Sequence, residues 1–235
     1  MKAEKQRIET PTLQQRIRRE VLAWFWVGLV FLLINGAVGQ ARVIPSASME
    51  NTLLIGDHLL MSRVGYDAGV PFTNAHLTLW RTPKRGQMVI FRPVIPGESS
   101  DVIKRVIGLP GETVDIRDGG VWIDGSRLPE PYTVGRTEPG DPSLLRAGFR
   151  GIFPYSLPPD CFFVMGDNRE NSLDSRFTGC IPRANIVGTP VMIYLSIDTP
   201  SEPWGSGAVI DRLAAYANAV LHPSEVRWRR LFRLF

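Results

Sequence analysis

Apolar residues in this chain form one long run near the start and many short runs after it. The long run, residues 21–38, contains no charged side chain. As a helix rising about 1.5 Å per residue, it would span roughly 27 Å, which is close to the hydrocarbon thickness of a bilayer. The pattern therefore predicts a single transmembrane helix over residues 21–38.

The charges around this run predict its orientation. Six Lys and Arg residues precede it and only Arg42 follows closely, so the positive-inside rule places the basic segment 1–20 in the cytoplasm and the remainder outside. A cleaved signal peptide is the alternative, because residues 37–39 (Ala-Val-Gly) resemble a cleavage site. The length of the run, with Trp24 and Trp26 near its start, favours an anchor.

Short runs rich in Val and Ile follow, separated by Gly, Pro and Asp. They predict strands at 58–64, 88–92, 102–108, 113–117, 121–124, 161–165 and 187–195. Asp118, Gly119 and Gly120 provide the turn of a hairpin. We therefore expect a mainly β fold of antiparallel sheets after the transmembrane helix.

The same pattern suggests how the outer part is divided. We expect one β-rich main domain in two parts, 42–112 and 161–222, interrupted by a smaller β subdomain, 113–160. Helical spacing of apolar residues over 209–221 predicts a helix that packs on the core. The tail 223–235 mixes Arg with bulky apolar residues, so it lies either on a membrane interface or in solvent.

Composition and charge narrow the class of protein. With 44% hydrophobic and 21% charged residues, the chain can bury a core and is not disordered. Its net charge of +4 is concentrated at the two ends, which favours an anionic membrane surface over nucleic acid. No helix-turn-helix or zinc-ligand spacing is present, and we expect no nucleic acid, metal or cofactor.

Lysine is scarce, with only four among 27 basic residues. The presence of a lysine at position 104, within an apolar strand, therefore calls for an explanation. Strand alternation puts Lys104 and Arg105 on opposite faces. A buried lysine can lose its proton, whereas an arginine cannot. Without burial, only about one lysine in a thousand is neutral near pH 7.4. A snorkelling lysine at a sheet edge is the alternative for this segment alone.

Two other segments are rich in short polar side chains. Residues 44–53 (IPSASMENTL) follow the apolar run, and residues 164–179 (VMGDNRENSLDSRFTG) follow a predicted strand. Each on its own is compatible with an ordinary turn or an exposed loop. Asp174 and Arg176 are spaced to form a charge-assisted pair.

Taken together, P-S-x-S-M, I-K-R-V-I-G-L-P-G and G-D-N-R-x-N-S-x-D-S-R occur in an order that resembles bacterial type I signal peptidases, the Ser–Lys endopeptidases that remove signal peptides from exported proteins. The resemblance implies that the main domain is catalytic, that Ser48 is the nucleophile and that Lys104 is the general base. It also implies an oxyanion hole formed by the Ser46 hydroxyl and the Ser48 backbone N–H. Ser172 would orient the lysine, supported by the pair Asp174–Arg176.

The resemblance also implies a substrate that binds as an extended strand between residues 42–45 and 101–104. Small side chains of an Ala-x-Ala sequence would enter shallow apolar pockets. The candidate pocket residues are Ile44, Pro45, Met49, Leu53, Val102 and Ile103.

The sequence departs from the family pattern S-M-x-P-T-L beside the nucleophile. Asn51 replaces the proline, and Glu50 adds a negative charge. Both changes bear on the rigidity of the turn and on substrate preference. Ala47 stands where glycine is frequent, which argues against a strongly positive φ there.

Cys161 and Cys180 flank the third motif. Because the predicted orientation places them outside the cytoplasm, we expect a disulfide rather than a thiol nucleophile. Neither cysteine is close to a histidine in sequence.

Several alternatives remain at this stage. A relative specialised for pilin or conjugation substrates shares these motifs, and a LexA-like self-cleaving repressor shares the chemistry but carries a DNA-binding domain. A Ser–His–Asp hydrolase would use one of three histidines, although no G-x-S-x-G accompanies them. A membrane-anchored β domain that only binds would lack Ser48 or Lys104. The favoured interpretation is a monomeric single-pass protein of the bacterial inner membrane that acts on signal peptides.

Overall fold

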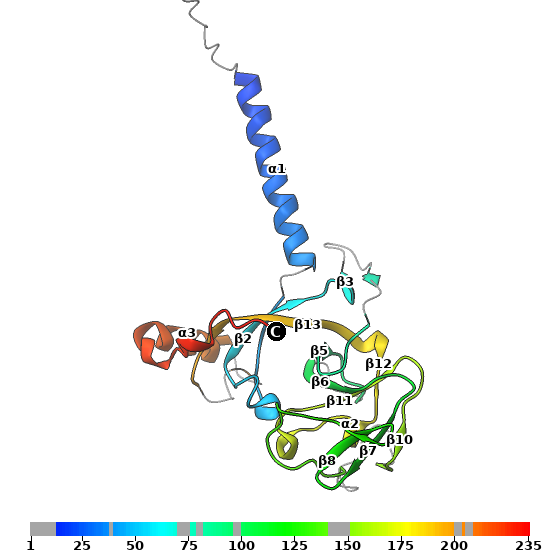
Figure 1. The fold of residues 1–235 in the computed structure, drawn as a ribbon. Coiled ribbons are helices and arrows are strands. Elements are labelled where there is room, and N and C mark those ends of the chain that lie inside the picture. Colours follow the sequence, from blue (N-terminus) through cyan, green and yellow to red (C-terminus); the bar gives the residue numbers. More distant parts are fainter. Residues whose placement is uncertain are drawn as a thin grey trace, which may run out of the picture.

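The computed structural model describes residues 13–37, 40–69, 76–78, 82–95, 100–140, 151–199, 204 and 209–235. Figure 1 shows a β-rich body from which one long helix, α1 (Leu13–Ala37), stands out. Among the described residues, no helix combines the length and the apolar character that a membrane crossing requires. Helix α1 begins before the predicted residue 21, and residue 38 lies outside the described part of the chain.

The main sheet has seven antiparallel strands. Its longest strand, β13, pairs with β5 at its start and with β2 over the rest of its length, so it joins the two halves of the sheet. The strands in spatial order are β1 (Gln40–Val43), β2 (Asp57–Ser62), β13 (Ile186–Ser196), β5 (Met88–Phe91), β6 (Val102–Gly108), β11 (Cys161–Met165) and β12 (Ile181–Pro182).

A separate four-stranded sheet lies at the end of the body away from α1 (Figure 1). Its spatial order is β10 (Tyr155–Ser156), β7 (Thr113–Arg117), β8 (Gly120–Ile123) and β9 (Ser126–Arg127). Asp118 and Gly119 have φ values of 53° and 69°, which suits the tight turn between β7 and β8. A further pair, β3 (Asp67–Gly69) and β4 (His76–Thr78), completes the described strands.

Helical segments connect and cover the sheets. They are η1 (Ala47–Met49), η3 (Arg169–Asn171), α2 (Ser175–Thr178), η4 (Arg183–Asn185), α3 (Val209–Leu221), η5 (Pro223–Glu225) and η6 (Trp228–Arg230). After η6 the chain returns to β13, where the Phe232 backbone N–H donates to the Ile193 carbonyl (2.7 Å). The end of the chain is therefore attached to the centre of the main sheet.

The predicted mainly β fold of antiparallel sheets is confirmed, and each predicted strand overlaps an observed one. The pattern missed β1, because this strand follows the long apolar run directly and resembles a linker. Helix α3 has the predicted extent and packs on a buried cluster, as predicted. The contact is made by the small Ala215 and Ala219, whereas the large Ile210 and Leu213 are exposed.

Candidate active site

The turn at residues 44–53 is held to the start of β2 by backbone hydrogen bonds. The Ile44 N–H donates to the Asp57 carbonyl (2.9 Å), and the Gly56 N–H donates to the Ile44 carbonyl (3.0 Å). Met49 and Leu53 are fully buried in the core below. The short helix η1 therefore fixes Met49 in the core and carries the neighbouring Ser48 in a fixed position.

Lys104 reaches this turn from β6. Its Nζ lies 2.6 Å from the Ser48 Oγ, and both residues are buried, with Lys104 only 3% exposed. Strand alternation explains why Arg105 points elsewhere, but Arg105 is buried too, because its guanidinium binds Asp167. Both faces of β6 are therefore covered.

Burial lowers the pKa of the Lys104 ammonium from 10.5 to about 8. The charges of Asp174 and Asp167 oppose this change, and Arg176 reinforces it. At a pKa of about 8, about one lysine in five is neutral at pH 7.4, compared with about one in a thousand for an unperturbed lysine. Lys104 can therefore accept a proton from a contacting hydroxyl near neutral pH.

Ser46 is exposed, on the same turn as the buried Ser48. Its Oγ is 3.4 Å from the Ser48 Oγ, and its backbone is extended with φ of −136° and ψ of 155°. A donor is thus available beside Ser48 on the side open to solvent.

The third motif packs against the backbone of Ser48. The Asn168 N–H donates to the Ser48 carbonyl (3.2 Å). At Gly166, an added Cβ would lie 2.3 Å from the Ser172 Oγ and 2.4 Å from the Ser48 carbonyl oxygen, so only glycine fits. The motif therefore limits where the Ser48 backbone can lie.

Asp174 organises the rest of this motif. Its carboxylate accepts hydrogen bonds from the Ser172 hydroxyl (2.7 Å), from the Gly166 N–H (3.0 Å) and from the Arg176 Nε (2.9 Å). Burial alone would raise the pKa of Asp174, but the charge and hydrogen bonds of Arg176 outweigh it and lower the pKa. Asp174 therefore remains a carboxylate, and the Ser172 hydroxyl is directed toward it.

A groove opens in front of the Ser48–Lys104 pair, with a volume of about 200 Å³. Four of the predicted pocket residues line it, namely Ile44, Pro45, Val102 and Ile103, together with Leu59 and Ile90, which the sequence did not indicate. Met49 and Leu53 are not among the residues that line this groove, and both are fully buried in the core.

An ion pair joins the two segments that border this groove. Arg42, from β1, contacts Asp101, just before β6, at 2.6 Å. Both residues line the groove. Among the described residues, no group of His, Cys, Asp and Glu side chains could hold a metal ion.

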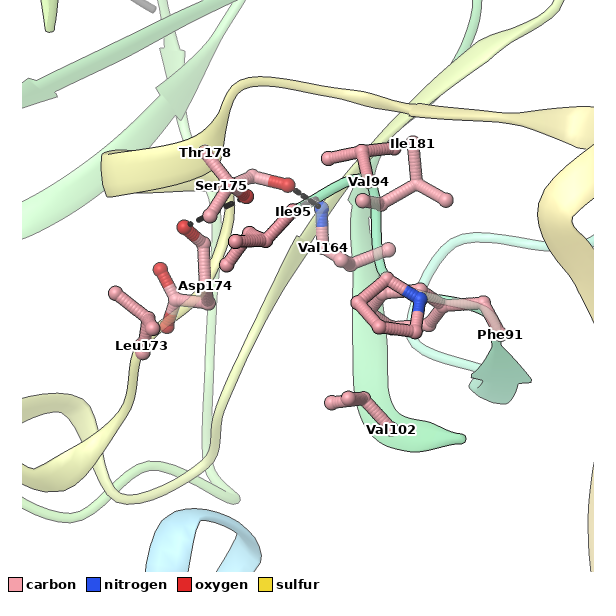
Figure 2. Close-up of a pocket in the computed structure, with 11 residues that line it drawn as sticks. Phe91, Val94, Ile95, Val102, Val164, Leu173, Asp174, Ser175, Thr178 and Ile181 are labelled. Atoms are coloured by element: carbon pink, nitrogen blue, oxygen red, sulfur yellow. Dashed lines mark hydrogen bonds between the residues drawn. The ribbon is translucent and has the colours of Figure 1, made fainter. Parts of the chain in front are cut away.

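A second, smaller hollow of about 30 Å³ lies beside the third motif (Figure 2). Val102 lines both this hollow and the groove, whereas Asp174 and Ser175 border only the hollow. The Val164 N–H donates to the Ser175 Oγ (3.0 Å). This bond attaches the start of α2 to β11 and so holds the motif against the main sheet.

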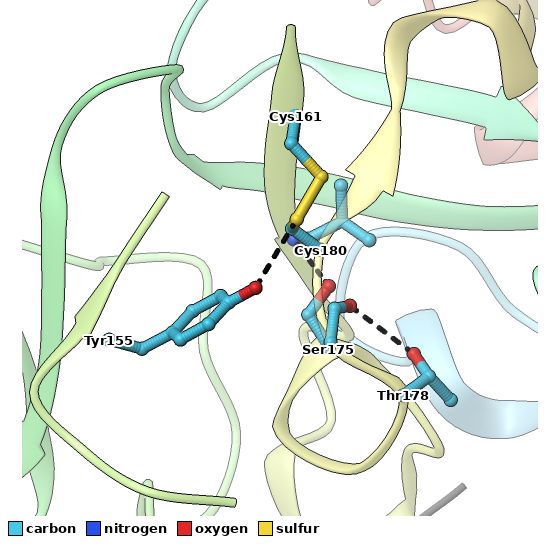
Figure 3. Close-up of a disulfide and its surroundings, with 7 residues drawn as sticks. Tyr155, Cys161, Ser175, Thr178 and Cys180 are labelled. Carbon is cyan, nitrogen blue, oxygen red and sulfur yellow. Dashed lines mark hydrogen bonds between the residues drawn. A yellow bond between two sulfur atoms is a disulfide. The ribbon is translucent and has the colours of Figure 1, made fainter. Parts of the chain in front are cut away.

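Cys161 and Cys180 form a disulfide with a Cα–Cα distance of 5.6 Å (Figure 3). The hydroxyl of Tyr155 donates to the Cys180 Sγ (3.5 Å). The disulfide connects the start of β11 with the residue before β12. It therefore closes the loop that contains Ser172, Asp174 and Arg176.

Asn51, which stands in place of a proline, has a φ of 85°. Proline cannot adopt this angle, since its ring holds φ near about −65°. The Asn51 side chain donates to the Tyr132 carbonyl (3.1 Å), and the neighbouring Glu50 accepts from the Asn168 side chain (3.3 Å). Side-chain hydrogen bonds thus restrain the turn where the family pattern has a rigid ring.

The sequence did not reveal two buried ion pairs next to the turn. Arg105 Nε donates to Asp167 Oδ1 (2.8 Å), and the Thr52 hydroxyl donates to the same carboxylate (2.5 Å). Arg230 donates to Asp57 Oδ2 (2.6 Å) and to the Thr52 carbonyl (2.9 Å). The position of Arg105 beside Lys104 was a signal for the first pair, but nothing in the sequence connected Arg230 with Asp57.

Comparison with known proteins agrees with this geometry. The family model described as "Signal peptidase, peptidase S26" matches residues 17–195. The chain is 36% identical over 185 residues to signal peptidase I of Leptolyngbya laminosa, covering 75% of this chain and 80% of that protein. It is 32% identical over 194 residues to probable signal peptidase I-1 of Synechocystis sp., covering 80% and 85%.

A crystal structure of a signal peptidase I from Enterococcus faecalis aligns with 34% identity and a TM-score of 0.37, covering 46% of this chain and 97% of that chain. The match to the family model and the identity to relatives over most of the chain show the same relationship as the three motifs. The chain therefore belongs to the S26 family of signal peptidases.

Proposed function

We propose that this signal peptidase removes signal peptides from exported proteins with a Ser48–Lys104 dyad. The observation that carries the proposal is the 2.6 Å approach of the Lys104 Nζ to the Ser48 Oγ, with both groups buried. Neutral Lys104 takes the hydroxyl proton as the Ser48 oxygen attacks the scissile carbonyl. The protonated lysine then gives that proton to the leaving amine, and water releases the acyl group with Lys104 again as base.

The charge that develops on the scissile carbonyl oxygen needs donors aimed at it. The Ser46 hydroxyl, 3.4 Å from the Ser48 Oγ, and the Ser48 backbone N–H supply them. Ser172, Asp174 and Arg176 act as positioning residues. Their hydrogen-bonded cluster keeps a negative charge near Lys104, which opposes a further fall of the lysine pKa.

The substrate lies as an extended strand in the groove between residues 42–45 and 101–104. The apolar lining formed by Ile44, Leu59 and Ile103, in a cavity of about 200 Å³, favours small side chains over large ones. This shape supports cleavage after Ala-x-Ala.

Residues 21–38 anchor the protein in the bacterial inner membrane, with the N-terminal side in the cytoplasm and the catalytic domain outside. Large apolar side chains exposed on α1, among them Trp24, Phe25 and Trp26, support this assignment. The disulfide in the β-rich body supports it too, because disulfides persist in oxidising compartments.

The test is cleavage of a purified preprotein with an Ala-x-Ala site by the full chain in detergent. Ser48→Ala and Lys104→Arg each reduce cleavage by at least about 10³-fold, because each removes one member of the dyad. Lys84→Arg is the matched control, since Lys84 is an exposed lysine, and it retains activity. Wild-type activity in either dyad variant, with an unchanged circular dichroism spectrum, refutes the proposal.

A further inference from the structure

Two strand segments that line the groove have a neighbouring strand on one side only. Among the described strands, β1 pairs only with β2, and Val102–Lys104 of β6 pair only with β5. The pairing of β6 with β11 begins at Arg105. Residues of both segments line the groove, so each segment can offer one free backbone edge to an extended peptide.

The Arg42–Asp101 ion pair connects these two segments. The Arg42 Nη2 donates to the Asp101 Oδ2 (2.6 Å). Apart from Lys104, these two are the charged residues among the described residues that line the groove. The side chain of Arg42 is 46% exposed and that of Asp101 is 18% exposed, so water reaches the pair and its net attraction is weak. A charged side chain on a bound peptide can therefore compete for either partner.

The spacing along β6 indicates which substrate residue meets the ion pair. Asp101 precedes Lys104 by three residues, which corresponds to about 10 Å in an extended chain. Ile103, from the apolar lining, lies between them in sequence, as Ile44 lies between Arg42 and Ser48. We count the residue that bears the scissile carbonyl as the first. An extended peptide then passes the apolar lining and reaches the ion pair with its fourth residue before the cleaved bond.

We propose that the Arg42–Asp101 ion pair determines specificity at this fourth position, where it favours an uncharged side chain. A lysine or a glutamate at this position gains one partner, but it meets the like charge of the other and has to separate the pair. An uncharged side chain leaves the ion pair intact. The inference rests on the proposed cleavage by Ser48, and it adds a charge preference to the preference for small side chains.

The experiment compares three peptides with an Ala-x-Ala site that differ only at the fourth position, which carries alanine, lysine or glutamate. The full chain in detergent should give the highest kcat/KM with the alanine peptide and similar, lower values with the other two. Arg42→Gln removes the cation, so lysine should be favoured over glutamate by about tenfold. Asp101→Asn removes the anion and should favour glutamate over lysine by about the same factor.

An exchange of the two charges tests whether the residues act as a pair. The double variant Arg42→Asp and Asp101→Arg keeps one cation and one anion, so the ratio of kcat/KM for lysine and glutamate should return to the wild-type value. Arg117→Gln is the matched control, because the pair of Arg117 and Asp115 has a similar exposure, 50% and 22%, and lies in the four-stranded sheet. This control should leave the ratio unchanged.

Two results overturn the proposal. One is an unchanged ratio in both single variants, and the other is a tenfold change that persists in the exchanged variant. If a single variant loses cleavage altogether, its affinity for the peptides is measured by fluorescence anisotropy with Ser48→Ala added. Equal affinity for the lysine and glutamate peptides then overturns the proposal as well.

Failure of the proposed function gives a different result. In that case the wild type does not cleave the alanine peptide, or Ser48→Ala cleaves it as fast as the wild type does. Failure of the charge preference alone leaves cleavage of the alanine peptide dependent on Ser48, with the same ratio for lysine and glutamate in every variant.

Discussion

Two buried carboxylates, Asp57 and Asp174, have nearly the same set of partners. Each binds a guanidinium through both of its oxygens, Arg230 for Asp57 and Arg176 for Asp174. Each also accepts one serine hydroxyl and backbone N–H groups. The chemistry of the two clusters is therefore nearly the same.

Their positions give them different tasks. Asp57 and Arg230 hold the turn that follows Ser48, since Arg230 also donates to the Thr52 carbonyl (2.9 Å). Asp174 acts on Lys104, because its charge raises the pKa of this lysine. One cluster holds the turn that carries Ser48, and the other adjusts how readily Lys104 loses its proton.

Removal of either guanidinium should produce the largest effect. Arg230→Met and Arg176→Met each leave a buried carboxylate without its cation, so we expect the free energy of unfolding to fall by about 3–5 kcal/mol. Urea denaturation measures this change. Arg117→Met is the control, because Arg117 is half exposed beside Asp115 and should cost no more than about 1 kcal/mol. If Arg230→Met behaves like this control, the Asp57 cluster does not hold the turn.

Buried Lys104 should destabilise the fold while it is protonated. A fall in pKa from 10.5 to about 8 corresponds to roughly 3 kcal/mol, at about 1.36 kcal/mol per pKa unit. Lys104→Met should therefore raise the free energy of unfolding at pH 7 by roughly that amount.

The pH dependence of this difference has a definite sign. Between pH 8 and 10.5 the unfolded chain binds the lysine proton and the folded chain does not, so the stability of the wild type rises with pH. The advantage of Lys104→Met should shrink over that window. Parallel stability curves for the two proteins would show that the lysine pKa is not lowered by folding.

The contrast between the clusters also shows what the sequence could predict. The partners of Asp174 lie within eight residues of it, so the third motif contained the whole cluster. Asp57 is bonded to Ser196 and Arg230, which are 139 and 173 residues away. No periodicity or local spacing connects such positions, because the folded sheet alone brings them together.

Helix α3 shows the same limit on what the sequence could predict. Apolar periodicity predicted where the helix lies, since spacing depends on local geometry. It did not predict which face is covered, because Ala215 and Ala219 are buried by Ile197 and Trp204, which lie outside the helix. In contrast, β6 was predicted residue for residue, because its Val and Ile residues are bounded by Asp101 on one side and by the Leu-Pro-Gly segment on the other.

Ser196 and Ser172 allow a smaller test of the same difference, because Ser196 donates to Asp57 and Ser172 donates to Asp174. Ser196→Ala and Ser172→Ala each remove one hydrogen bond to a buried carboxylate, so each should cost about 1–3 kcal/mol of stability. Only Ser172→Ala should also change the pH dependence of kcat/KM, because its partner Asp174 acts on Lys104. An equal change in the pH profile of Ser196→Ala would contradict this division.

The smallest expected effect is a shift of the pH profile itself. Because the base must be neutral, kcat/KM should rise with pH through about 8, the pKa of Lys104. Asp174→Asn removes the negative charge that raises this pKa, so the midpoint should move to lower pH. Asp57→Asn, which removes a carboxylate of equal burial and similar partners, should leave the midpoint in place even where it lowers kcat/KM at every pH. A midpoint that moves by the same amount in both variants would show that the two clusters act on Lys104 alike, and the distinction between holding the turn at Ser48 and adjusting the pKa of Lys104 would then be lost.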